Sequence, residues 1–145
     1  IPFILEKIGG EGRIIAIDYA GKMIEEFRKK CFPSNVTGMV ADMHSTGFSD
    51  ETFDRVIVNA CYPHFEDKKA ALMEIYRIMK KNGIFIISHI RGRRFINDLH
   101  RRSNRLIGKD IIPGVQELSS EAGSCGFTFL NGADEDDFYF AVFKK

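Results

Sequence analysis

The sequence predicts an α/β protein with a doubly wound sheet that is mostly parallel and has a reversed C-terminal strand. Short apolar runs, typical of strands, alternate with amphipathic stretches, typical of helices, along the 145 residues. The last two apolar runs, at 127–130 and 138–143, are too close together to hold a crossover helix between them. They are therefore expected to pair as an antiparallel hairpin, and residues 1–145 are expected to form a single domain.

The first half of the chain predicts two strands, each leading to an acidic residue. Its expected elements are a helix at 2–8, a strand at 13–18, a helix at 21–31 and a strand at 36–40. The first strand is rich in isoleucine and bounded by glycines, which is typical of a buried parallel strand. It ends at Asp18, and the second strand leads to Asp42. Open α/β sheets bind ligands at the carboxyl ends of their strands, so both carboxylates are candidate ligand contacts.

The second half continues the alternation. Its expected elements are a strand at 53–59, a helix capped by Asp67 and ending at Lys81, a strand at 83–88, helices at 91–105 and 115–125, and the closing hairpin. The 91–105 helix carries six arginines around an apolar stripe of Phe95, Ile96, Leu99 and Leu106. Those arginines could bind an anionic substrate, although a solvated face is the commoner reason for a charge run.

Composition limits the possible partners and the cellular setting. Lys and Arg number 21 against 20 Asp and Glu, so no overall field favours nucleic acid or a membrane. The three cysteines are widely spaced and contain no C-x-x-C pair, which argues against a disulfide framework and a zinc site. We therefore expect a cytoplasmic protein with no metal and no membrane partner.

Four features, in this order and spacing, resemble class I S-adenosylmethionine-dependent methyltransferases that act on small molecules. They are the strand ending in Asp18, the Ala41-Asp42-Met43 turn, the strand at 53–59, and the antiparallel hairpin. The resemblance implies a Rossmann-like fold of which this chain supplies six strands, S-adenosyl-L-methionine as cofactor, and methyl transfer to a small-molecule acceptor.

The resemblance also implies a segment ahead of this sequence. In that family a first strand and a glycine-rich loop precede the first helix, and this sequence opens where the helix would begin. We expect that strand and loop to lie upstream, because their loss would leave neighbouring strands with unpaired edges. Without them we expect poor folding or weak cofactor binding.

The resemblance assigns cofactor contacts to seven residues. Asp18 would accept hydrogen bonds from the ribose hydroxyls, because a carboxylate offers acceptors only; a helix N-cap is the alternative. Asp42 and Met43 would contact adenine, and an ordinary turn is the alternative. His44 is expected to be only an exposed loop residue. The expected set is Asp18, Tyr19, Met23, Asp42, Met43, Asn59 and Ala60.

Tyr62 and His64 are the candidate catalytic residues. A histidine can take a proton from the acceptor near neutral pH, and a tyrosine hydroxyl can orient it. Methyl transfer needs mainly alignment and desolvation, so a packed or solvated histidine is the alternative. Asn59 is not followed by the Pro-Pro-aromatic pattern of methyltransferases that act on amino groups of DNA and proteins, which disfavours such substrates.

Two other functions stay open from the sequence. A nicotinamide-dependent oxidoreductase also places an acidic residue after its second strand, although the closing hairpin and Asp42-Met43 argue against it. A non-catalytic remnant of the methyltransferase fold would keep the same pattern without cofactor chemistry.

Overall fold

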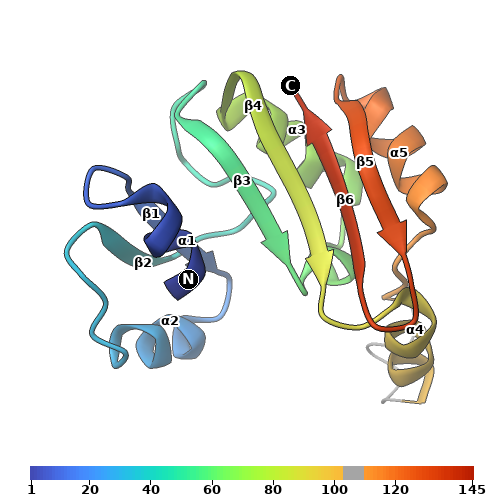
Figure 1. The fold of residues 1–145 in the computed structure, drawn as a ribbon, viewed down its shortest axis with the longest axis horizontal. Helices are drawn as coiled ribbons and strands as arrows, with labels where there is room; N and C mark the ends of the chain where they lie inside the picture. Colours follow the sequence, from blue (N-terminus) through green and yellow to red (C-terminus); the bar gives the residue numbers. More distant parts are fainter. Residues whose placement is uncertain (103–109) are drawn as a thin grey trace. The chain divides into compact units, whose positions relative to one another are not determined.

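The structure, a computed structural model, describes residues 1–102 and 110–145. It has the expected α/β architecture, with six strands among the described residues (Figure 1). The chain forms two compact units, residues 1–47 and residues 48–145, and the expectation of a single domain stays a prediction. No helix among the described residues has the length and apolarity needed to cross a membrane.

The first unit contains two helices and a parallel strand pair. Its elements are α1 (Pro2–Ile8), β1 (Ile14–Asp18), α2 (Gly21–Arg28) and β2 (Val36–Val40). The strands pair in register from Ile14 opposite Val36 to Asp18 opposite Val40. The predicted elements are therefore confirmed, except that α2 ends three residues before Cys31, whose positive φ of 48° is incompatible with a continuing right-handed helix.

The expectation that β1 is a buried strand is wrong, because none of its five residues is fully buried. Ile15 is 39% exposed, because β1 pairs with β2 alone in a two-stranded sheet of this unit. Helix α2 buries Ile24 and places Phe27 against β2 at Gly38. A Cβ at Gly38 would lie 2.5 Å from the Phe27 ring, so the close approach of this helix requires glycine there.

The second unit is a four-stranded mixed sheet with the order β3-β4-β6-β5. Its elements are β3 (Phe53–Asn59), η1 (Tyr62–His64), α3 (Lys68–Ile78), β4 (Met79–His89), α4 (Arg93–Arg102), α5 (Val115–Ser124), β5 (Thr128–Asp134) and β6 (Tyr139–Lys144). β3 and β4 are parallel, whereas β6 runs antiparallel to β4 and β5. This confirms the predicted closing hairpin.

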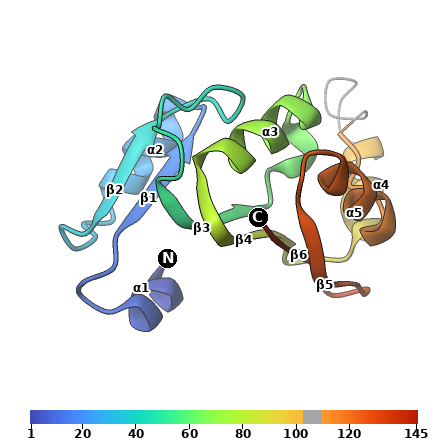
Figure 2. The ribbon, with the colours of Figure 1, turned by 90° about the horizontal axis from the view of Figure 1, so that it is seen from above.

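The core of this unit lies between the sheet and two helices. Helices α3 and α5 contact each other and lie on the same face of the sheet (Figure 2). The side chains shielded from water between them and the sheet include Leu72, Ile75, Phe85, Ile87, Leu118 and Phe143. The rings of Phe85 and Phe143 stack across neighbouring strands with their centroids 5.6 Å apart.

The predicted boundary between α3 and β4 is wrong. The sequence predicts helix through Lys81 and a strand from residue 83, but the helix ends at Ile78 and the strand begins at Met79. Met79 pairs with Phe53 of β3, and Asn82, with a φ of 64°, donates its N–H to the Lys145 carbonyl. Sheet pairing therefore overrides the helical pattern of this segment.

The predicted apolar stripe of α4 is not its buried face. Phe95 and Leu99 are 53% and 49% exposed, whereas Asn97 and His100 are buried. The reason is a double hydrogen bond: Asn97 donates to the Ile112 carbonyl at 3.0 Å and accepts from the Ile112 N–H at 2.8 Å. The predicted helix extended to Arg105, and its stripe to Leu106; both residues lie outside the described residues.

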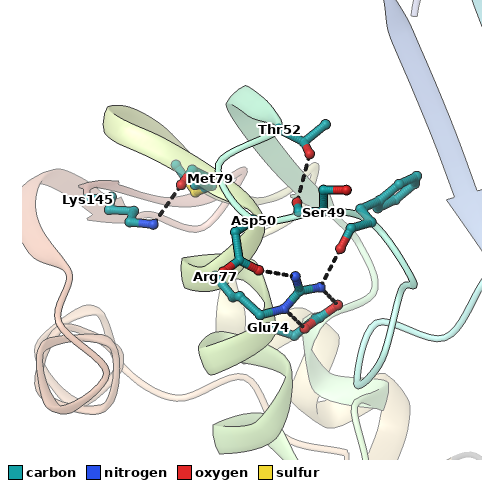
Figure 3. Close-up of polar contacts among 8 residues, drawn as sticks. Ser49, Asp50, Thr52, Glu74, Arg77, Met79 and Lys145 are labelled. Carbon is teal, nitrogen blue, oxygen red and sulfur yellow. Dashed lines mark hydrogen bonds and ion pairs between the residues drawn. The ribbon is translucent and has the colours of Figure 1, made fainter.

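Arg77 ties the end of α3 to the segment before β3 (Figure 3). Its Nε and Nη2 donate to the two carboxylate oxygens of Glu74, each at 2.8 Å. Its Nη1 donates to Asp50 at 2.5 Å, and Nη2 also donates to the Phe48 carbonyl at 2.7 Å. The hydrogen bonds to Glu74 and Asp50 raise the pKa of Arg77, so the guanidinium holds this corner as a permanent cation.

Candidate functional site

Asp18 is the last residue of β1, and one of its two carboxylate oxygens has a hydrogen-bond partner. Its Oδ1 accepts a hydrogen bond from the Ala20 N–H at 2.8 Å, and its carbonyl accepts from the Ala41 N–H at 3.1 Å. The N-cap of α2 is Ala20, with no side-chain cap, so Asp18 shapes the turn into the helix without capping it. Among the described residues nothing donates to Oδ2, so one carboxylate oxygen can accept hydrogen bonds from a ligand.

Asp42 lies at the corresponding end of β2 and is paired with His44. Its Oδ1 accepts from the His44 N–H at 2.9 Å and lies 2.6 Å from His44 Nδ1. These contacts, the backbone hydrogen bond first, lower the pKa of Asp42. The expectation that His44 is merely an exposed loop residue is wrong, because the turn closed by the Asp42–Ser45 bridge returns its side chain to Asp42, where it is 27% exposed.

The other first-unit candidates differ in exposure. Tyr19 and Met23 are 79% and 56% exposed, and Met43 is half-buried. Tyr19 follows Asp18 directly, and Met23 lies in the first turn of α2. Large apolar side chains that are exposed beside an open carboxylate can pack on a ligand that the carboxylate binds.

In the second unit, β3 ends in a sharp turn at Asn59 and Ala60. Asn59 accepts a hydrogen bond at 3.0 Å from the hydroxyl of Ser88 on the neighbouring strand. Ala60 has a φ of 57°, in the left-handed region, and donates its N–H to the Ser88 carbonyl at 2.8 Å. A non-glycine residue in this conformation is uncommon outside turns and functional sites, and here it lies at the carboxyl end of a parallel strand.

Tyr62 is fully buried and donates its hydroxyl inward. The hydroxyl lies 2.8 Å from Glu121 Oε2 on α5, and no surface of the residue is exposed. Burial, together with the hydrogen bond to Glu121, raises the pKa of Tyr62. The hydroxyl is therefore engaged inside the protein, where it connects η1 to α5.

His64, two residues further on, is accessible and paired with a carboxylate. Its side chain is 45% exposed, and its Nδ1 lies 2.7 Å from Asp110 Oδ2. Its ring centroid lies 5.1 Å from that of His100. The sequence analysis missed Asp110 and His100 as partners of His64, and no local pattern marks them, because Asp110 is 46 residues away.

His89, the last residue of β4, is a buried histidine near the same pair. It is 5% exposed, and its Nε2 has no hydrogen-bond partner among the described residues. Burial, followed by the charges of His64 and His100, lowers the pKa of His89 to about 4. The described residues contain no group of His, Cys, Asp and Glu that could hold a metal ion.

Comparisons with known proteins identify the family of this chain. The family described as "Methyltransferase domain" matches residues 2–87. A curated relative, the ubiquinone/menaquinone biosynthesis C-methyltransferase UbiE of Geotalea daltonii, is 29% identical over 87 residues, which are 57% of this chain and 37% of that protein. The chain thus spans little more than a third of that relative's length.

Solved structures share the fold. A methyltransferase of Haloferax volcanii, in complex with the Trm112 methyltransferase activator, superposes with a TM-score of 0.81 at 18% identity, covering 99% of this chain and 76% of that one. A SAM-dependent methyltransferase of Aquifex aeolicus superposes with a TM-score of 0.78 at 16% identity, covering 99% and 74%. Identities this low establish the fold alone.

Proposed function

Because this chain belongs to the methyltransferase domain family, we propose that it binds S-adenosyl-L-methionine and takes part in transferring the methyl group to a small-molecule acceptor. The observation that carries the proposal is the family match over residues 2–87. That range includes β1, β2 and β3, whose ends hold Asp18, Asp42 and Asn59. The name of the curated relative, a C-methyltransferase of quinone biosynthesis, supports a small-molecule acceptor.

The first unit supplies acceptors that suit the adenosine part of the cofactor. The open Oδ2 of Asp18 is proposed to accept from ribose hydroxyls, which are donors that a carboxylate binds well. Asp42 and Met43 are proposed to contact adenine. The pairing of Asp42 with His44 engages Oδ1, so Oδ2 is the atom we assign to the adenine amino group. Tyr19 and Met23 are proposed to add apolar contact.

The second unit is proposed to act on the acceptor side. Asn59 and Ala60 are assigned further cofactor contacts, mainly through their backbone. When bound, the cofactor supplies a methyl group on a positively charged sulfur, whose departure to the acceptor leaves a neutral thioether. His64 is proposed as the residue that takes a proton from the acceptor, because its imidazole is both accessible and paired with Asp110. We assign Tyr62 a positioning role, because its hydroxyl donates to Glu121.

We also propose that the protein works in the cytoplasm. The described residues hold no disulfide, and the side chains of Cys31 and Cys61 are exposed. Exposed thiols persist in a reducing compartment.

Calorimetric titration of the full chain with S-adenosylmethionine tests the proposal. The hydrogen bonds assigned to Asp18 involve a charged acceptor, so Asp18→Asn should weaken binding by about 10- to 100-fold. Asp98→Asn is the matched control, because Asp98 is an exposed residue of α4 that contacts Arg101; it should leave the affinity unchanged.

Three outcomes contradict the proposal. Absence of binding by the folded protein would indicate a non-catalytic remnant of the fold. Stabilisation by a nicotinamide dinucleotide alone would indicate an oxidoreductase. Equal affinity of the wild type and Asp18→Asn would remove Asp18 from the site.

A further inference from the structure

Asp110 contacts two histidines through two different groups. Its side-chain Oδ2 lies 2.7 Å from Nδ1 of His64, and its backbone carbonyl oxygen contacts Nδ1 of His100. The two imidazole rings lie 5.1 Å apart and are tilted by 48°. One residue, located just before α5, therefore orients two rings that come from η1 and α4.

These contacts determine which nitrogen of each ring carries the proton. A carboxylate oxygen and a carbonyl oxygen only accept, so Nδ1 of His64 and Nδ1 of His100 must both donate. In a neutral imidazole the other nitrogen then holds a lone pair. Asp110 thus makes Nε2 of His64 the basic atom, and the carboxylate also stabilises the imidazolium that forms when Nε2 takes a proton.

His89 supplies an independent sign that this region binds a ligand. The residue is only 5% exposed, yet its Nε2 has no hydrogen-bond partner among the described residues. The ring of Tyr139 faces His89 with centroids 6.2 Å apart, but the Tyr139 hydroxyl donates to the Pro113 carbonyl at 3.1 Å. A buried polar atom left unpaired costs free energy, which a polar ligand would recover.

The location of the cluster fits a ligand site. His64 lies in η1, directly after β3, and His89 ends β4. These strands are parallel neighbours, with Asn59 opposite Ser88 at their carboxyl ends. This is the edge at which open α/β sheets bind their ligands.

We propose that Asp110 is a positioning residue that makes His64 a general base for an acceptor carrying a weakly acidic hydroxyl group. In this step the acceptor O–H bond breaks and an Nε2–H bond forms on His64. The electron pair stays on the acceptor, which becomes the nucleophile for the methyl group, and the imidazolium later releases its proton to water. The inference rests on the proposed function for the identity of the reaction.

The chemistry of the cluster favours a hydroxyl over other acceptors. Lone-pair nitrogens and a carboxylate attract a hydrogen-bond donor. A phosphate would instead need cationic or N–H donor groups, which are the groups that bind anions in other proteins. A neutral amine can attack a methyl group before it loses a proton, so it gains less from a base. A hydroxyl group is a much stronger nucleophile once its proton has been removed.

The tautomer assignment can be tested without any substrate, by long-range ¹H–¹⁵N NMR spectra of the histidines in the full chain. We expect Nδ1–H forms at both His64 and His100. Asp110→Ala should remove this preference at His64 and leave it at His100, whose partner is a backbone carbonyl that the substitution keeps. An Nε2–H form of His64 in the wild type, or no change at His64 in the variant, would overturn the inference.

The base can be tested with 4-nitrophenol, a weak acid whose ionised form absorbs visible light. The wild type should bind it as the phenolate, His64→Gln should weaken this binding by about tenfold, and Asp110→Ala by about threefold, since each removes an interaction with a charged form. Asp98→Ala is the control and should bind like the wild type. His64→Asn replaces His64→Gln if circular dichroism shows the latter unfolded.

The outcomes separate the two proposals. Equal phenolate binding by all variants, or no binding to the wild type, overturns the role of His64 and Asp110 even if S-adenosylmethionine binds. A positive result with 4-nitrophenol in a protein that does not bind S-adenosylmethionine supports the base and contradicts the methyltransferase proposal.

Discussion

Replacing Tyr62 by phenylalanine separates a structural tyrosine from a catalytic one. The substitution keeps the buried ring and its edge-on contact with Phe65, 5.8 Å between centroids, and it removes only the hydroxyl. That hydroxyl donates to Glu121 at 2.8 Å, and the tyrosine has no exposed surface. Tyr62→Phe therefore leaves the Glu121 carboxylate without this donor.

The expected cost follows from the type of bond. A hydrogen bond to a charged group contributes about 1.5–3 kcal/mol to stability. For a chain of 145 residues the entropy of unfolding is about 0.3 kcal/mol/K, so the unfolding midpoint should fall by about 5–10 °C. Differential scanning calorimetry of the cofactor-free protein measures this shift.

Two further variants sharpen the test. Tyr19→Phe is the matched control, because this tyrosine is 79% exposed and loss of its hydroxyl should change stability by less than about 0.5 kcal/mol. In a double-mutant cycle, Tyr62→Phe should cost much less in a Glu121→Gln background, because the charged acceptor is already gone.

A midpoint for Tyr62→Phe that equals the wild type would refute this reasoning. So would additive effects of Tyr62→Phe and Glu121→Gln, because two groups that are bonded to each other must show coupling. Cofactor affinity, followed by calorimetric titration, should stay unchanged in Tyr62→Phe, and a loss of affinity without loss of stability would return Tyr62 to the site.

Three other predictions concern the second unit. Asp67→Ala removes the N-cap of α3, whose side chain accepts from the Ala70 N–H at 2.9 Å. It should lower the free energy of unfolding, measured by urea denaturation, by about 1 kcal/mol. Asp67→Asn, which can still cap, should cost less, and equal losses in the two variants would contradict the capping role. Leu72→Ala opens a cavity at a residue that is 1% exposed and should cost about 2–5 kcal/mol in the same measurement; a loss below 1 kcal/mol, by the same scale, would show that the core relaxes around it. The pKa of His89 is about 4 in the folded protein and near 6.5 without burial. Between these pH values the unfolded chain therefore binds a proton that the folded chain excludes. The free energy of unfolding should fall by up to about 3 kcal/mol as the pH drops from 6.5 to 4. His89→Leu should flatten this slope, and an unchanged slope would assign the acid sensitivity to other groups.

Local patterns were sufficient for much of the fold. The alternation of strands and helices, the Asp67 cap and the closing hairpin follow from periodicity and from loop length, which involve residues near one another in the chain. The choice of Asp18 and Asp42 as candidate ligand contacts follows from the general rule that open α/β sheets bind ligands at the carboxyl ends of their strands. The structure confirms that each lies at, or just after, the end of its strand.

Periodicity was insufficient where partners compete. Along α4 the pattern shows which residues share a face. It does not show that two hydrogen bonds between Asn97 and Ile112, one donated by each residue, turn the Asn97 side inward and leave Phe95 exposed. At the end of α3, the pairing of Met79 with Phe53 places Met79 in strand β4 rather than in the helix. Both outcomes depend on contacts with segments that are distant in the sequence.

The α/β architecture, the family resemblance and the candidate residues at the strand ends could all be predicted from the sequence, because these depend on composition and spacing. How those candidates are engaged depends on the tertiary structure. It brings Asp110 to His64, 46 residues away, and Glu121 to Tyr62, 59 residues away. Such pairings leave His64 accessible for the base role proposed above and hold the Tyr62 hydroxyl inside the protein, because the role of a polar side chain is determined by its partner and by its access to water.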